Sequence, residues 1–525
     1  MVATARGARK ATPAGVVLAE GWWSAILIVA FAAYYVAPGR PLSLLLLAVC
    51  AVLCYLQLPL AVSLVPLAVP FFMLPKHLGR PNPEFALGET AIALCAAAFV
   101  VRLGQGLLSG DREAIDFRPL VRRDLLTGAV ALFLVAVTLS TLTARYHQFA
   151  FRYYRWVILE PIAYYALVVL LLRDARSQLR ALYALAGAGL LVALLGLGQR
   201  LFRPSALTGT VWTGTVPHPL RLISSVYGSP DNLGLFLDRA IPVALVLGLI
   251  GSGALGARRA GATLTPAWAV WAALLPLLAI VPMALAVLLS GSRGAMIVAP
   301  AVCLLAALLW RGRLNAPWTR AGRLELVGLL AVLVGVVLVL ARIQHGLSTI
   351  ARVWLWQSAL AMIRDHPVFG VGPDNFLYYY FYPRYANDPS HPHIEDCVRG
   401  VTLPAKHYMN PLAWRESCLS HPHNVALDAW LSTGLLGLVA LALVVVGFAV
   451  LARRNVRVSR DRVTRGIQLA AVAVVAATLL HGLVDNSIFV PDLAVAFWLA
   501  LALTRSVAEA AHRERRPHAA LRTRQ

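Results

Sequence analysis

The chain runs again and again through stretches of about 15 to 25 residues that carry almost no charge. A helix of that length crosses the hydrocarbon core of a bilayer, where the backbone must satisfy its own hydrogen bonds. Hydrophobic residues make up 59% of the 525 residues and charged residues only 14%, which argues against a soluble globule, a disordered chain and a collagen-like fibre. The sequence therefore predicts an all-α polytopic membrane protein.

About fourteen apolar runs are long enough to be candidate spans, with twelve as the lower estimate. The runs lie near residues 18–37, 42–57, 60–75, 85–101, 125–143, 156–172, 179–198, 233–250, 267–290, 294–310, 324–342, 425–452, 466–484 and 490–505. The lower estimate applies if 42–57 and 60–75, which are joined across Gln57 and Pro59, form one re-entrant hairpin.

Six segments follow from this pattern, because two of the connections are much longer than the others. They are N-terminal transmembrane helices (1–198), an extracytoplasmic loop (199–232), central transmembrane helices (233–342), a large extracytoplasmic loop (343–424), C-terminal transmembrane helices (425–505) and a basic tail (506–525). Long loops in compact membrane proteins tend to carry function. The large loop contains short helices, one of which is predicted at about 347–364 and ends before His366 and Pro367.

The net charge of +23 comes from basic residues that lie between the apolar runs and do not form one basic face, which argues against a nucleic-acid partner. If the N-terminus is cytoplasmic, 29 of the 47 Lys and Arg residues fall in cytoplasmic segments. Cytoplasmic loops retain basic residues, so both termini are predicted in the cytoplasm and the two long loops outside.

Three arginines stand at the predicted outer face. Arg221 precedes a span, Arg293 lies in the sequence SGSRGA between two apolar helices, and Arg352 lies on the predicted helix of the large loop. Guanidinium groups match the oxygens of a phosphate, which indicates an anion site. The alternative for Arg293 is a turn whose side chain reaches the lipid headgroups.

Two histidines in the sequence His421-Pro-His423 come directly before a span. A histidine there titrates near neutral pH and can take a proton from a hydroxyl group, while the alternative is a structural role at the helix start, where Asn424 is the better cap. Zinc is the competing interpretation, because further possible ligands lie nearby in the sequence: His391, His393, Glu395, Asp396 and His407. The intervening proline favours divergence of the two rings, so no metal is predicted.

Cys397 and Cys418 lie in the large loop, on the side where disulfides persist, and are predicted to be bridged; two free thiols are the alternative. His481 and Asp485 lie at the outer end of a span. Ionisable groups at such positions usually face the interior of the helix bundle, although a pair reaching the membrane surface has the same sequence pattern.

The order of these motifs resembles the O-antigen ligase and polymerase superfamily of bacterial envelopes. The motifs are SGSRGA, then RVWLWQSALAMIRDHPVFGVGPDNF, then HPHN before an apolar helix with STGLLG, and finally HGLVDN, within roughly residues 219–490. The resemblance implies a multi-pass glycosyltransferase of the bacterial inner membrane with an extracytoplasmic active site, and it implies no cofactor and no metal. The donor would be an undecaprenyl-diphosphate-linked glycan, and the acceptor a glycan or a lipid-A core.

Residue by residue, the resemblance makes Arg221, Arg293 and Arg352 the groups that hold the diphosphate. It makes His423 the general base, with His421 as second choice. Asn375, His481 and Asp485, which lie in the shared motifs, are the further candidates for substrate binding.

Two alternatives remain for the function. A flippase for lipid-linked oligosaccharides would also need many spans and cationic residues, but we find no inverted repeat, and the polar residues gather at one face. A polyprenyl-phosphate-sugar transferase would need an acidic residue in the first outer loop, and residues 38–41 contain none. The sequence does not separate a ligase from a polymerase.

Overall fold

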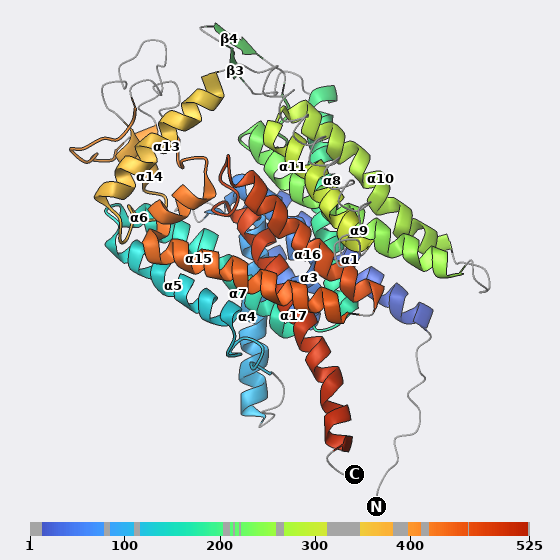
Figure 1. Ribbon diagram of the computed structural model, residues 1–525. Helices are drawn as coiled ribbons and strands as arrows, with labels where there is room; N and C mark the ends of the chain where they lie inside the picture. Colours follow the sequence, from blue (N-terminus) through green and yellow to red (C-terminus); the bar gives the residue numbers. More distant parts are fainter. Residues whose placement is uncertain are drawn as a thin grey trace, which may run out of the picture.

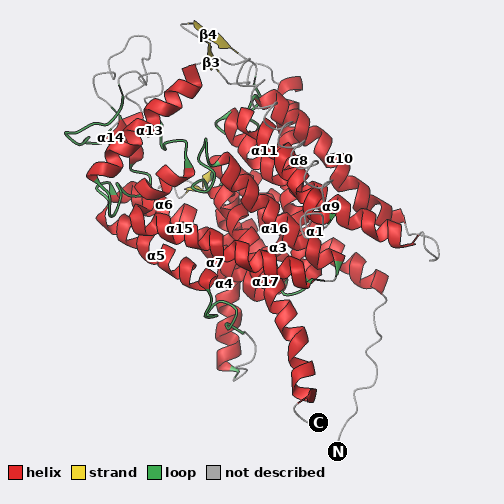
Figure 2. Cartoon of the chain, viewed as in Figure 1, coloured by secondary structure: helices red, strands yellow, loops and turns green. Residues whose placement is uncertain are grey.

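A computed structural model gives the fold of the chain. It describes residues 13–77, 84–109, 116–202, 210–213, 216–219, 222–258, 267–311, 347–381, 397–398, 400–410, 419–459 and 461–522. Helices dominate these residues (Figures 1 and 2). The strands form two antiparallel hairpins, β1 (Lys76–His77) with β2 (Glu84–Phe85) and β3 (Thr210–Thr213) with β4 (Val216–Pro219).

The N-terminal part is a series of apolar helices. They are α1 (Pro13–Val36), α2 (Arg40–Leu56), α3 (Leu58–Ala68) with a 3₁₀ turn (Val69–Met73), α4 (Leu87–Leu108), α5 (Leu125–Thr143), α6 (His147–Tyr153), a π-helical turn (Tyr154–Leu159), α7 (Glu160–Leu171) and α8 (Ala175–Phe202).

The remaining helices follow the first long loop. They are α9 (Pro230–Arg258), α10 (Ala267–Ser290), α11 (Arg293–Trp310), α13 (Leu347–Asp365), α14 (Phe376–Tyr380), α15 (Val425–Val458), α16 (Arg462–His481) and α17 (Pro491–Arg522). The helix predicted at about 347–364 is confirmed as α13.

Ten helices within the described residues are long and apolar enough to cross a membrane, and the three at the N-terminus, Gly21–Val36, Arg40–Leu56 and Leu58–Met73, are apolar but shorter. The all-α polytopic membrane fold is thereby confirmed. The span predicted at 324–342 lies outside the described residues, so the number fourteen stays a prediction.

Helix α9 lies at the centre of the bundle, where it packs against α8, α10, α11 and α16. In its most apolar window 83% of the residues are buried, compared with 22% for α4 at the periphery. Glycine permits the close approach to α10, since a β-carbon on Gly251 would come 2.6 Å from the Cα of Ala273. On its other side α10 exposes Leu275, Val281 and Leu288, as a lipid-facing surface requires.

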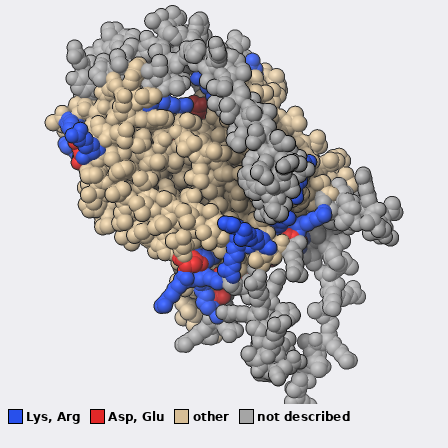
Figure 3. Space-filling model, in the orientation of Figure 1, with Lys and Arg blue, Asp and Glu red and all other residues tan. Residues whose placement is uncertain are grey.

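The two ends of the bundle differ. Figure 1 shows α13, α14 and the β3–β4 hairpin at one end, while α4 and α17 project at the other. Segments predicted to share the cytoplasmic side do meet there, because Arg122 forms an ion pair of 2.7 Å with Glu509. Figure 3 shows Lys and Arg side chains gathered near this end, below a broad uncharged surface. Which end faces the cytoplasm stays a prediction.

Helix α15 is broken near its N-terminal end. Gly434 has φ 73° and ψ 177°, a conformation that glycine adopts without steric cost. The break frees backbone groups for the turn that follows α13: the carbonyl of Val368 accepts from the Leu435 N–H at 3.1 Å, and the carbonyl of Leu431 accepts from the Val371 N–H at 2.8 Å. Backbone hydrogen bonds therefore hold the large loop to α15.

Candidate functional site

Three segments that are far apart in the sequence meet at the end of the bundle where α13 and α14 lie. They are α13, the turn that leads into α15, and the loop between α16 and α17. The turn is held to the loop by backbone, because the Val425 N–H donates to the carbonyl of Gly482 at 2.7 Å. Asn424 caps α15 by accepting from the N–H groups of Ala426 and Leu427, so the capping role expected of this residue is confirmed.

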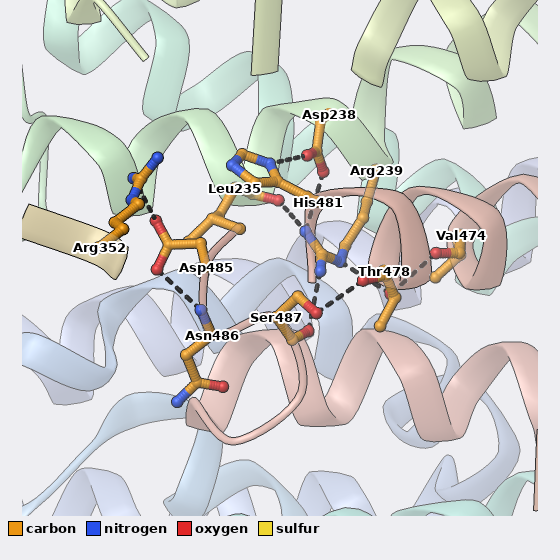
Figure 4. Close-up of polar contacts among 10 residues, drawn as sticks. All are labelled: Leu235, Asp238, Arg239, Arg352, Val474, Thr478, His481, Asp485, Asn486 and Ser487. Carbon is orange, nitrogen blue, oxygen red and sulfur yellow. Dashed lines mark hydrogen bonds and ion pairs between the residues drawn. The ribbon is translucent and has the colours of Figure 1, made fainter. Parts of the chain in front are cut away.

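Asp485 is the centre of this junction. Its Oδ1 lies 2.7 Å from Nδ1 of His423 and accepts the Asn486 N–H at 2.7 Å, while its Oδ2 lies 4.0 Å from Nη2 of Arg352. Figure 4 shows the carboxylate between Arg352 and Asn486. Only 5% of the Asp485 side chain is exposed, so these partners replace water around a buried charge.

His421 lies beside His423, with ring centroids 4.5 Å apart at 72° and its Nε2 3.5 Å from Oδ1 of Asp485. The expected divergence of the two rings is wrong. The reason is the backbone of His423, whose φ of 48° turns the second ring back toward the first. A non-glycine residue at positive φ is strained, and such strain is concentrated at functional sites.

Asp485 carries a negative charge at neutral pH. Burial by itself would raise the pKa of this carboxyl, but the charge of His423 and its hydrogen bond, with His421 adjacent, hold the pKa well below the usual range. An ionised carboxylate on Nδ1 fixes the orientation of the His423 ring and stabilises the imidazolium ion. In this orientation Nε2 is the ring atom opposite Asp485, and it is the one that a proton exchange would use.

The structure brings two of the three predicted arginines into this region. Arg293 interacts electrostatically with Arg352 and with Asp231, and Asp231 interacts with Asp485 and His423 as well. An anion of two charges matches this pair of guanidinium groups. Arg221, the third predicted arginine, lies outside the described residues.

His481 belongs to a second, fully buried polar cluster beside Asp485, to its right in Figure 4. Its Nδ1 lies 2.5 Å from Oδ2 of Asp238, and Asp238 Oδ1 lies 2.8 Å from Nη1 of Arg239. Arg239 also donates to the carbonyl of Ser487 at 2.8 Å and to Oγ1 of Thr478 at 3.2 Å. This cluster joins α9 and α16 to the loop that carries Asp485.

Two further carboxylates interact electrostatically with His421. Asp374, at φ 55°, forms an ion pair of 3.2 Å with Arg152; burial raises its pKa, while Arg152 and His421 oppose the rise. Asp428 is buried in α15, accepts from Ser432 at 3.1 Å and interacts electrostatically with His421 and Asp374.

Asn375 and the cysteines have other surroundings. The Asn375 side chain accepts the Tyr146 N–H at 2.9 Å and donates to the carbonyl of Pro373 at 2.8 Å, which fixes a turn. Cys397 is disulfide-bonded, and the other cysteines among the described residues are free thiols. Cys418 lies outside the described residues, so the Cys397–Cys418 pairing stays a prediction.

Sequence reasoning missed several of these charged residues. Asp238 and Arg239 stand in the middle of an apolar span, and this was the available signal, because ionisable residues inside a membrane usually face the bundle interior. Asp428 carried the same signal, because it lies in the span predicted at 425–452, whereas Asp231 and Asp374 lie outside the predicted spans.

A metal ion also has possible ligands here. One atom each from His421, His423 and Asp485 lie within 4.8 Å of one another. His391, His393, Glu395 and Asp396, which were part of the zinc interpretation, lie outside the described residues.

Comparison with known proteins agrees with the motifs of the site. Residues 278–442 match the O-antigen ligase family model. The O-antigen ligase segment begins in α10, ends in α15, and includes Arg293, Arg352, Asn375, His421 and His423. The match confirms the resemblance to O-antigen ligases and polymerases and supports a membrane enzyme of that type. No curated protein matches the chain.

Proposed function

We propose that the protein is a membrane glycosyltransferase that transfers a glycan from an undecaprenyl-diphosphate-linked donor to an acceptor hydroxyl group. The observation that supports this most directly is the 2.7 Å contact between His423 and the ionised Asp485, next to Arg352 and Arg293. The O-antigen ligase match over residues 278–442 supports the same class of reaction.

In the proposed reaction, the acceptor oxygen attacks the anomeric carbon of the donor glycan. A glycosidic bond forms, the bond between that carbon and the diphosphate oxygen breaks, and the hydroxyl proton passes to Nε2 of His423. Asp485 stabilises the imidazolium ion that results. Arg293 and Arg352 stabilise the charge that develops on the departing diphosphate.

The diphosphate leaving group brings its own activation, so the proposed reaction needs neither a nucleotide nor a metal. The acceptor is a lipid-A core in a ligase and another glycan in a polymerase. The proposed location is the bacterial inner membrane, with both termini in the cytoplasm and the site on the outer side.

The test uses the full chain in detergent or nanodiscs, with a polyprenyl-diphosphate glycan and a candidate acceptor. We expect release of the carrier diphosphate without added nucleotide, and mass analysis of the product separates a ligase (one added block) from a polymerase (a ladder). His423→Ala should lower turnover by about 10² to 10⁴, the usual worth of a general base, while donor binding is retained. His147→Ala, at an exposed position on α6, is the matched control.

Two results would contradict the proposal. Full turnover in the His423→Ala protein would remove this residue as the base. Movement of a fluorescent lipid-linked glycan across the bilayer, with no transfer, would favour the flippase.

A further inference from the structure

We infer that His421, His423 and Asp485 form an inhibitory site for a transition-metal dication of the Zn²⁺ type. The inference has two parts. Binding of the ion depends only on these three side chains, whereas inhibition by the ion rests on the proposed function.

Two of the three separations between the ligand atoms come near those of such an ion, and all three atoms lie within 4.8 Å of one another. In a tetrahedral zinc site with bonds of about 2.0 to 2.1 Å, neighbouring ligand atoms are about 3.3 Å apart. Nε2 of His421 already lies 3.5 Å from Oδ1 of Asp485. Nδ1 of His423 is at 2.7 Å, the distance of a hydrogen bond, and would have to move away by about 0.6 Å to reach the tetrahedral separation. Three protein ligands leave a fourth position open.

His421 supplies an independent observation. Its Nε2 is buried and makes no hydrogen bond of ordinary length within the described residues; it lies 3.5 Å from Oδ1 of Asp485. Its other ring nitrogen, Nδ1, lies 3.0 Å from Oγ of Ser420. When Nδ1 donates its hydrogen to this hydroxyl group, Nε2 carries the lone pair of the ring and can bind a metal. Histidine ligands in metal sites usually have their second nitrogen hydrogen-bonded in the same way.

The surrounding groups would hold the carboxylate but limit the affinity. The Asn486 N–H orients Asp485, as outer groups orient metal ligands elsewhere. Arg352, 4.0 Å from Oδ2, repels a cation, and Asp231 partly offsets this repulsion. We therefore expect weaker binding than at a structural zinc site, which suits a reversible inhibitor better than a permanent component.

Binding of the ion would stop the proposed reaction in a simple way. The ion takes the place of the Nδ1 hydrogen that His423 shares with Asp485, so the one hydrogen of the neutral ring moves to Nε2. Nε2 then cannot accept a proton from the acceptor hydroxyl group, and the dication also changes the charge that a diphosphate meets.

The binding experiment uses the chelator-treated full chain and Co²⁺ as a spectroscopic substitute for Zn²⁺. We expect one equivalent of Co²⁺ to give the visible absorption of a complex with fewer than six ligands, and Zn²⁺ to displace it. His421→Gln should weaken binding at least about tenfold, since loss of even an outer partner costs about 10- to 100-fold. His147→Ala should bind as the wild type does. Equal binding by the wild type and His421→Gln would overturn the proposal.

A second variant guards against misfolding. If His421→Gln fails to fold, Asp485→Asn in the same titration must show the same loss, and unchanged binding by that folded variant would overturn the site. Inhibition is measured as the ratio of glycan transfer with and without Zn²⁺, and this ratio should fall in the wild type. An active enzyme that binds Zn²⁺ without losing activity would refute the inhibition, whereas a wild type that binds Co²⁺ but transfers no glycan would refute only the proposed function.

Discussion

The backbone of Gly294 lies directly against the ring of His481: a β-carbon on Gly294 would stand 2.1 Å from Nε2 of the histidine. Gly294 follows Arg293 at the start of α11, and His481 ends α16. The contact therefore fixes how closely the first turn of α11 approaches the buried Asp238–His481 pair.

Gly294→Ala should be harmful for this reason. The ring of His481 is held by Asp238, and the start of α11 cannot move without displacing Arg293. We therefore expect an overpacking cost of about 1 to 3 kcal/mol and weaker donor binding. Gly128→Ala in α5, where a β-carbon meets nothing within 4 Å, is the matched control and should be neutral or slightly stabilising. Donor affinity and apparent melting temperature are measured for both, and equal values would refute the role of the contact.

Arg352 and Asp231 should affect donor binding in opposite directions. Arg352→Gln removes a charged donor to the diphosphate, so binding should weaken by about 10- to 100-fold, as for other charged hydrogen bonds. Asp231→Asn removes a negative charge that interacts with Arg352 and Arg293, and binding should tighten. Equilibrium binding of the donor lipid tests both, and weakening in both variants would contradict a diphosphate site here.

Asp485→Asn should impair both turnover and stability at neutral pH. An amide cannot stabilise the imidazolium ion of His423, so we expect a fall in turnover of about 10² or more. Because the pKa of Asp485 is held below that of an unfolded aspartate, the stabilising effect of the charge is complete above about pH 4 and is lost as pH falls further, toward the folded pKa.

The melting temperatures of the wild type and Asp485→Asn, measured against pH, test this sign. Their difference should be constant from neutral pH to about pH 4 and should shrink below it. A difference that grows under acid conditions would mean that the pKa of Asp485 is raised instead.

Asp238 and His481 should behave as a coupled pair. Removal of either partner leaves a buried polar group without its contact, so Asp238→Ala and His481→Ala should each cost about 3 to 5 kcal/mol. The double variant should lose less than the sum of the two, because the shared contact is lost only once. A double-mutant cycle on thermal stability measures the coupling, and additive losses would show that the pair is not coupled.

The disulfide of Cys397 gives a prediction about pairing. If Cys418 is the partner, Cys397→Ser, Cys418→Ser and the double variant should all lose the same stability, about 2 to 4 kcal/mol. Cys303→Ser, which removes a free thiol, is the control. Mass analysis of peptides without reduction identifies the bridge, and different losses in the two single variants would contradict this pairing.

The membrane helices could be predicted from the sequence because their cause is local. An apolar run of sufficient length forms a helix in a bilayer whatever its neighbours are, and α13 could be bounded in the same way, by Asp365, His366 and Pro367 at its end.

The partners within the site could not be predicted in this way, because they are separated along the chain by loops whose geometry follows no period. His423 meets Asp485 across 62 positions, and Asp238 meets His481 across 243. The expectation of diverging histidine rings was wrong because it used the proline alone, and the left-handed backbone of His423 decides the geometry.

The break at Gly434 divides α15 into two parts with different attachments. The turns before Gly434 follow directly on His423 and accept hydrogen bonds from the Val371 N–H and from Oγ of Ser140 in α5, while the longer part after Gly434 packs along α5. The histidine turn is therefore joined by backbone hydrogen bonds to two loops: to the large loop through the first turns of α15, and to the loop that carries Asp485 through Val425 and Gly482. Glycine at this one position allows α15 to change direction without steric cost, so a single helix serves both the histidine turn and the helix bundle.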